Sequence, residues 1–296
     1  VLGLEATGEL RRRGSVLHHA GHEAPHRKVD IRSTGGRRVQ IVMEETGELL
    51  GTVDGSRAYW QVHPGAVYLH QGEQFEVRVL DLEANVAIVT RSDPDYYTQS
   101  RDTTDIEIVI EQERRRLSAE TETCYGTVRV TNQVVAYARK HVATGEVLEI
   151  VPLQLPPVPL ETRAVWWGVP QTLLDRAELR PSAIPGAAHA AEHAAIGLLP
   201  LVATCDRWDV GGVSTAYHPD TGSCAIFVYD GYQGGAGIAE RGFSSARRWL
   251  VATLETVSRC PCPHGCPSCV QSPKCGNGNE PLDKAGAVSL LEAMLG

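Results

Sequence analysis

Five of the eight cysteines lie close together between residues 260 and 275, and sulfur is a ligand that zinc prefers. A structural zinc ion takes four ligands in a tetrahedron, with thiolates at about 2.3 Å. The motif Cys266-Pro267-Ser268-Cys269 predicts a tight knuckle that presents two sulfurs from one turn, and Gly265 allows the close approach. The candidate ligands of one structural zinc ion are Cys260, Cys262, Cys266, Cys269 and Cys275.

The spacing does not decide which four of these cysteines bind the ion. Cys262 and Cys275 flank the knuckle and can close the site, which leaves Cys260 as the spare or as the substitute for either. His264 is a weaker substitute. Four thiolates leave no open coordination position, so the expected role is to fix a turn between two helices. The alternatives are an iron–sulfur cluster, whose ferredoxin spacing does not match, and disulfides.

A second pattern that could do chemistry is His189-Ala-Ala-Glu192-His193. On a helix the two histidines share one face, as in the H-x-x-E-H motif of zinc proteases, where a glutamate acts as base. A third ligand could come from Asp206, Asp209 or Asp230. Because the pattern is short, we favour a buried polar network between this helix and residues 205–209. A zinc-dependent hydrolase that uses His189, Glu192 and His193 is the alternative.

A third pattern is the glycine-rich stretch at residues 230–237, between an expected strand and an expected helix. Converging backbone N–H groups at a helix N-terminus attract anions, so a phosphate could bind there. No lysine and serine or threonine follow, as a P-loop requires, so a structural turn is the favoured interpretation. The sequence holds neither a G-x-x-x-x-G-K-[ST] motif nor the acidic box of helicases. We therefore expect no ATP hydrolysis by this chain alone.

The elements that must position these residues change along the sequence. Residues 38–110 alternate with period two and predict a small antiparallel sheet or barrel, in which residues 63–70 form a turn and a strand. Residues 111–123 are charged and predict a linker or a solvated helix. Trp166 and Trp167 are interpreted as core residues rather than as a platform for bases. Further strands are expected at residues 125–131, 134–140, 147–151, 210–217 and 224–229. Three helices are expected at residues 187–199, 238–257 and 284–295.

The composition is that of a globular protein, with 296 residues, 42% hydrophobic residues and a net charge of −8. This length suits two domains. The acidic balance excludes a uniformly basic nucleic-acid binder, so a contact with DNA would be local. The longest apolar run, residues 194–205, is too short to cross a membrane. The histidine-rich residues 18–26 predict a surface loop, and the start at Val1 suggests part of a longer protein.

Two stretches, residues 229–237 and 265–279, resemble the C-terminal part of MrfA/SftH-type superfamily II DNA helicases. Residues 63–73 and 189–193 are also similar, so the resemblance covers most of the chain. It implies part of a 3′-to-5′ ATP-dependent DNA helicase and translocase linked to DNA repair in bacteria. ATP would bind only to two motor domains upstream. Residues 1–13 would be the tail of a winged-helix domain, and the cysteines would belong to the MrfA zinc-binding domain, with four on one zinc ion.

We predict an α+β fold with a β-rich N-terminal half, followed by an α/β zinc-binding domain with a long helix before the cysteines. We expect three divisions of the chain. Residues 1–34 would be the end of a winged-helix-like region and a linker, and residues 35–116 would be a small β domain. Residues 117–296 would be a β-rich connector together with the zinc-binding domain.

The expected function is that of a non-motor accessory region that guides single-stranded DNA, bound weakly, beside motor domains of the same protein. The location would be cytoplasmic and nucleoid-associated in a bacterium, with no membrane contact. A protein-docking module without DNA contact is a further alternative. The residues expected to contact phosphates, in a salt-dependent way, are Arg114, Arg115, Arg116, Arg247, Arg248, Lys274 and Lys284.

Overall fold

The computed structural model describes residues 2–21 and 38–296. The first of these stretches holds a short helix and a hairpin: α1 (Leu2–Ala6), β1 (Leu10–Arg13) and β2 (Val16–His19). Most of the predicted histidine-rich loop, residues 22–26, lies outside the described residues, as does the expected division between residues 34 and 35.

The first sheet has five strands in the order β4-β3-β7-β6-β5. Alternate residues such as Phe75 and Val77 are buried, as the period-two pattern predicts. The predicted turn and strand at residues 63–70 is confirmed. All neighbours are antiparallel except β3 and β7, between which the chain passes through three other strands and the helix α2. The elements are β3 (Arg38–Met43), β4 (Leu49–Asp54), α2 (Gly55–Gln61), β5 (Val67–His70), β6 (Glu73–Asp81) and β7 (Val86–Arg91).

The second sheet has six strands and is built around the long strand β9. One edge of β9 pairs with β8, and its other edge pairs first with β11 and then with β10. The sheet curls until its edges meet: His218 Nε2 lies 2.9 Å from the carbonyl oxygen of Ile106, and the Ile108 N–H donates to Asp220. The strands are β8 (Tyr96–Arg116), β9 (Glu122–His141), β10 (Val147–Pro152), β11 (Val158–Val169), β12 (Val210–His218) and β13 (Ser223–Asp230).

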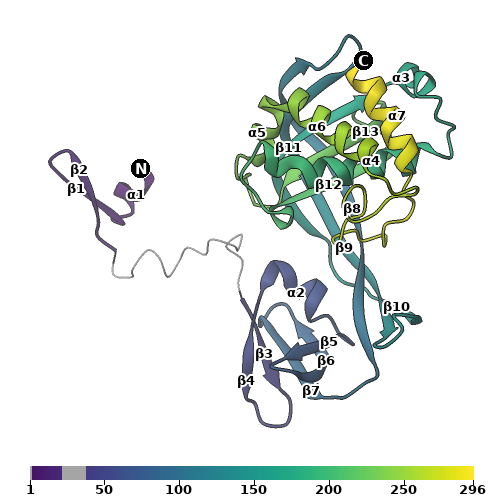
Figure 1. Ribbon diagram of the computed structural model, residues 1–296. Coiled ribbons are helices and arrows are strands. Elements are labelled where there is room, and N and C mark those ends of the chain that lie inside the picture. Colours follow the sequence, from purple (N-terminus) through teal and green to yellow (C-terminus); the bar gives the residue numbers. More distant parts are fainter. Residues whose placement is uncertain (1, 22–37) are drawn as a thin grey trace.

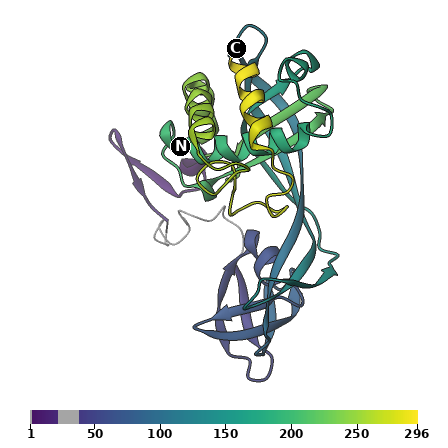
Figure 2. The same cartoon turned by 45° about the vertical axis from the view of Figure 1, so that its right-hand side comes forward.

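The paired strands β8 and β9 run from the first sheet to the part of the molecule that carries most of the helices (Figures 1 and 2). The linker or helix predicted at residues 111–123 is wrong, because β8 continues to Arg116. Its charged side chains form ion pairs along the hairpin, as Arg114 does with Glu111 and Glu122, so the strand remains solvated. The expected division between residues 116 and 117 falls at the tip of this hairpin, whereas residues 92–95 separate the two sheets.

Five helices of the described chain pack around the second sheet and confirm the α+β class. Trp167 and Trp249 are fully buried between sheet and helices, and Trp166 packs with Phe227 on the other face of the sheet. Both tryptophans of the pair are thus core residues, as expected. In the described chain, no helix has the length and apolar character to cross a membrane. The helices are α3 (Gln171–Arg176), α4 (Ile184–Leu198), α5 (Ile238–Ser244), α6 (Ala246–Arg259) and α7 (Lys284–Leu295).

The single helix predicted for residues 238–257 is two helices, because Ser245 has a non-helical backbone with φ −114° and ψ 14°. The first of them, α5, begins at the glycine-rich turn. Buried Asp230 accepts the N–H of Ala236 at 2.5 Å, of Ile238 at 3.3 Å and of Ala239 at 2.6 Å. The chain's own carboxylate therefore uses the donors that a phosphate would need, which confirms the structural interpretation of this turn.

Replacing Asp230 with alanine should lower the free energy of unfolding by about 2–4 kcal/mol, because several buried amides lose a charged acceptor. Urea unfolding measures this. Exposed Asp105 is the matched control, and its replacement with alanine should change stability by no more than about 0.5 kcal/mol. Equal effects of the two substitutions would contradict the capping role of Asp230.

Candidate metal centre

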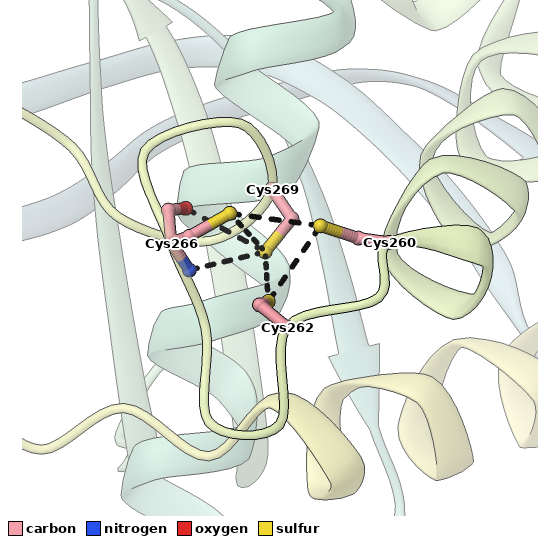
Figure 3. Close-up of side chains that lie close together, drawn as sticks. All are labelled: Cys260, Cys262, Cys266 and Cys269. Carbon is pink, nitrogen blue, oxygen red and sulfur yellow. Dashed lines mark hydrogen bonds between the residues drawn. The ribbon is translucent and has the colours of Figure 1, made fainter.

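Four cysteines from the segment between α6 and α7 turn their sulfurs toward one another (Figure 3). Cys260 Sγ lies 3.6 Å from Cys262 Sγ and 3.5 Å from Cys266 Sγ. Cys269 Sγ lies 3.4 Å from Cys262 Sγ and 3.7 Å from Cys266 Sγ. These separations exclude disulfides, in which the two sulfurs are about 2.05 Å apart.

The four sulfurs fit a tetrahedral zinc site. Bonds of about 2.3 Å from a central ion to four thiolates place neighbouring sulfurs about 3.8 Å apart. The observed separations of 3.4–3.7 Å are close to that value. All four ligand atoms lie within 4.8 Å of one another. The donor set and its geometry thus support zinc.

The knuckle depends on local backbone geometry. The N–H groups of Cys269 and Val270 donate to the carbonyl of Cys266, and the Cys266 N–H points at Cys269 Sγ, 3.3 Å away. Gly265 has φ +113°, and a Cβ there would lie 2.5 Å from Val270 Cγ2. Only glycine avoids both the backbone strain and this contact. The other pair follows directly from α6, since Cys260 is its C-terminal cap in extended conformation.

Lys284 supplies positive charge beside the sulfurs. Its Nζ donates to the carbonyl of Cys260 at 2.6 Å and to that of Cys262 at 2.7 Å. Four thiolates around a divalent ion leave an excess of negative charge, which an adjacent ammonium group stabilises. Lys284 is one of the residues that the sequence analysis assigns to a contact with DNA. Its position against the cysteine backbone was missed, and no local sequence signal connects residues that are more than twenty positions apart.

Cys275, the fifth candidate ligand, lies outside this group of four sulfurs. Its Sγ is 3.5 Å from His189 Nε2 on α4, and its partners in space are His189 and His193. His264 is not a member of either ligand group in the described chain. The remaining cysteines, Cys124, Cys205 and Cys224, lie apart, and burial raises the pKa of each.

The three residues of the protease-like pattern point in two directions. His189 Nδ1 and His193 Nδ1 each lie 2.9 Å from a backbone carbonyl, those of Pro281 and Val270. Glu192 turns to the sheet instead, where Ser214 Oγ donates to its carboxylate at 2.6 Å. Burial raises the pKa of Glu192 to about 7.

A polar network therefore forms around this helix, as predicted, but its partners are Pro281, Val270 and Ser214 and not residues 205–209. Glu192 does not belong to the group of ligand atoms that His189, His193 and Cys275 form. The arrangement of a metal-bound protease with a glutamate base is thus not assembled in the described chain.

Lys274, another expected DNA contact, is held by the protein itself. Its Nζ donates to the carbonyl of Val210 at 2.7 Å and to that of Arg207 at 3.2 Å, and it lies over the ring of Trp208. Burial lowers the pKa of Lys274 to about 8, against the opposing charge of Asp209. This ammonium group is committed to packing the cysteine-rich segment against the start of β12.

The five arginines lie where the tip of the β8–β9 hairpin meets α6. Arg247 donates to the carbonyl of Leu117 at 3.0 Å, which brings the two elements together. Arg115 pairs with Glu113 and lies over the ring of Phe243. Arg114 pairs with two glutamates, as described above. Arg116 and Arg248 are exposed, and within the described residues no acceptor lies in hydrogen-bonding distance of their side chains.

The sequence profile of the family described as the MrfA Zn-binding domain matches residues 191–270, which include the four clustered cysteines. The crystal structure of the DUF1998 helicase MrfA bound to DNA is similar over 99% of this chain, with a TM-score of 0.65 and 27% identity. The chain contains an MrfA Zn-binding domain. The resemblance seen in the sequence is thereby confirmed.

Similar proteins come from more than one organism. The ATP-dependent helicase YprA of Bacillus subtilis is 30% identical over 271 residues, and the ATP-dependent helicase hrq1 of Schizosaccharomyces pombe is 27% identical over 290 residues. These matches cover 90% and 92% of this chain. The chain covers only 36% of YprA, 27% of hrq1 and 38% of the MrfA structure, about a third of each.

Replacing Gly265 with alanine should destabilise the knuckle by about 1–3 kcal/mol, because an alanine at this φ is strained and meets Val270. Gly278 is the matched control, since it also has positive φ, +65°, but no atom within 4 Å of a built Cβ. Urea unfolding compares the two variants. A Gly278→Ala variant that loses as much stability as Gly265→Ala would contradict the crowding argument.

Proposed function

We propose that this chain is a non-motor accessory region of an ATP-dependent 3′-to-5′ DNA helicase that acts in DNA repair. ATP binding and hydrolysis belong, on this proposal, to motor domains of the same protein. The observation that carries the proposal is the tetrahedral spacing of four sulfurs within a chain that aligns along 99% of its length with a DNA-bound MrfA helicase. On this proposal, the chain guides single-stranded DNA along a surface whose shape one zinc ion maintains.

The zinc ion would be held by Cys260, Cys262, Cys266 and Cys269, and its role would be structural. Four thiolates fill a tetrahedral coordination sphere and leave no position for a substrate. The segment from Cys260 to Asp283 contains no helix or strand, so its own backbone gives it little support. When bound, zinc cross-links the end of α6 to the knuckle. That cross-link fixes the turn by which the chain reaches α7.

Replacing Cys269 with serine should remove one equivalent of zinc per chain and lower the melting temperature. Mass spectrometry of metal content and calorimetry measure the two effects. Cys205→Ser is the matched control, because Cys205 is partly buried but lies outside the sulfur group, and it should keep the full zinc content. Unchanged zinc content in Cys269→Ser would contradict the assignment.

Arg116 and Arg248 are the residues that we propose to contact phosphates. The other predicted basic residues bond to carbonyl oxygens or pair with glutamates of the chain, so a phosphate would have to displace those partners. Arg116 and Arg248 neighbour Leu117 and Arg247, whose hydrogen bond joins the hairpin tip to α6. Weak, local binding fits the overall charge of −8.

The double variant Arg116→Ala/Arg248→Ala should bind a labelled thymidine oligonucleotide several-fold more weakly at low salt. The slope of log K against log salt should fall by about 1 for each phosphate that the variant no longer binds. Arg91→Ala is the control, because Arg91 pairs with Glu73 in the first sheet. Equal binding by the double variant and the control would overturn the assignment, and no binding by the unmodified chain would favour a docking module without DNA contact.

We also propose that the whole protein works in the bacterial cytoplasm at the nucleoid. The proposal follows from its substrate, since a repair helicase must reach chromosomal DNA. The names of the MrfA, YprA and hrq1 relatives support the helicase part of the proposal.

A further inference from the structure

Three side chains outside the four-cysteine group bring their ligand atoms together. His189 and His193 come from α4 and Cys275 from the segment before α7, and one ligand atom of each lies within 4.8 Å of the others. Cys275 Sγ is 3.5 Å from His189 Nε2. A tetrahedral zinc ion with bonds of about 2.3 Å to sulfur and about 2.05 Å to nitrogen places these two atoms about 3.6 Å apart. The observed separation therefore suits two ligands of one ion.

The two imidazoles are oriented as metal ligands are. Each Nδ1 lies 2.9 Å from a backbone carbonyl, that of Pro281 for His189 and that of Val270 for His193. A carbonyl oxygen only accepts, so each Nδ1 donates, and the neutral form of each ring leaves the lone pair of Nε2 for a metal. Histidines that bind metals usually donate their other N–H to a carbonyl or carboxylate in this way. The centroids of the two imidazole rings lie 4.2 Å apart, because residues four positions apart share one face of a helix.

Cys275 is held in place by its own loop. The Asn279 N–H points at Cys275 Sγ at 3.1 Å. The Asn279 side chain closes the loop, since its Oδ1 accepts the N–H of Ser272 at 2.7 Å and its Nδ2 donates to the carbonyl of Ser272 at 3.1 Å. The thiol is thus presented to α4 by a fixed turn, as the position of a ligand requires.

We propose that His189, His193 and Cys275 bind a second divalent ion of the zinc and cobalt class. Two imidazoles and one thiolate form a borderline-soft donor set that suits these ions and disfavours magnesium and calcium. His189 and Cys275 are only half-buried, so water can supply the fourth ligand. The ion clamps the later part of the cysteine-rich segment to α4, whereas the four-cysteine site holds its earlier part.

The test counts metal in the full chain after incubation with excess Zn²⁺ and removal of loosely bound ions. The unmodified chain should hold two equivalents, and Cys275→Ser should hold one. Cys269→Ser should also hold one, but from the other site. His189→Ala is the second variant, chosen because its side chain is more exposed than that of His193, and circular dichroism verifies its fold. Cys205→Ser is the control and should keep both ions.

Cobalt substitution distinguishes the two sites by colour. A site with two nitrogens and one sulfur absorbs at shorter wavelength and with weaker charge-transfer bands than a site with four thiolates. Cys275→Ser and His189→Ala should lose only the shorter-wavelength bands, and Cys269→Ser should lose the thiolate bands. One equivalent of metal in the unmodified chain, unchanged in content and spectrum by Cys275→Ser and by His189→Ala, would overturn the second site and leave the four-cysteine site unaffected.

Discussion

The α/β half of the molecule depends on one constraint: the long segment between α6 and α7, which has no regular secondary structure, must be held in a fixed conformation. Between the end of α6 at Arg259 and the start of α7 at Lys284, backbone groups have no ladder of hydrogen bonds. Side chains take over this role: sulfurs meet at the knuckle, Lys284 binds the carbonyls of Cys260 and Cys262, and Asn279 closes the last turn. Ordering such a segment costs conformational entropy of about 1–2 kcal/mol per residue, so strong local cross-links are needed.

Helix α4 is the platform against which this segment is held. Its alanines let neighbours approach on all sides, and most of its residues are buried among β12, α6 and α7. A Cβ on Gly286 of α7 would lie only 2.8 Å from Cβ of Ala187, so the contact between α4 and α7 depends on small residues on both helices. The two histidines of α4 then reach the segment through the carbonyls of Val270 and Pro281. Packing of small residues thus positions the polar groups.

Local patterns predicted much of this arrangement, and contacts between distant residues were not predictable from them. The knuckle at Cys266 and Cys269, the alternating strands of the first sheet and the buried tryptophans follow from spacing and periodicity. The strand through Arg116 was missed because its charged residues lack an apolar face. The proximity of Cys275 to His189 joins residues 86 positions apart, and a sequence without aligned relatives carries no signal for such a pair. The contacts of Lys284 with the carbonyls of Cys260 and Cys262 are likewise not predictable from the sequence, because only the fold brings these residues together.

We propose that one ion bound by Cys260, Cys262, Cys266 and Cys269 fixes the cysteine-rich segment. An anomalous difference map, from crystals of this chain measured on both sides of the zinc absorption edge, tests it most directly. A peak about 2.3 Å from all four sulfurs is expected. The absence of a peak among these sulfurs, or a peak bound by Cys275 in place of one of them, would contradict it.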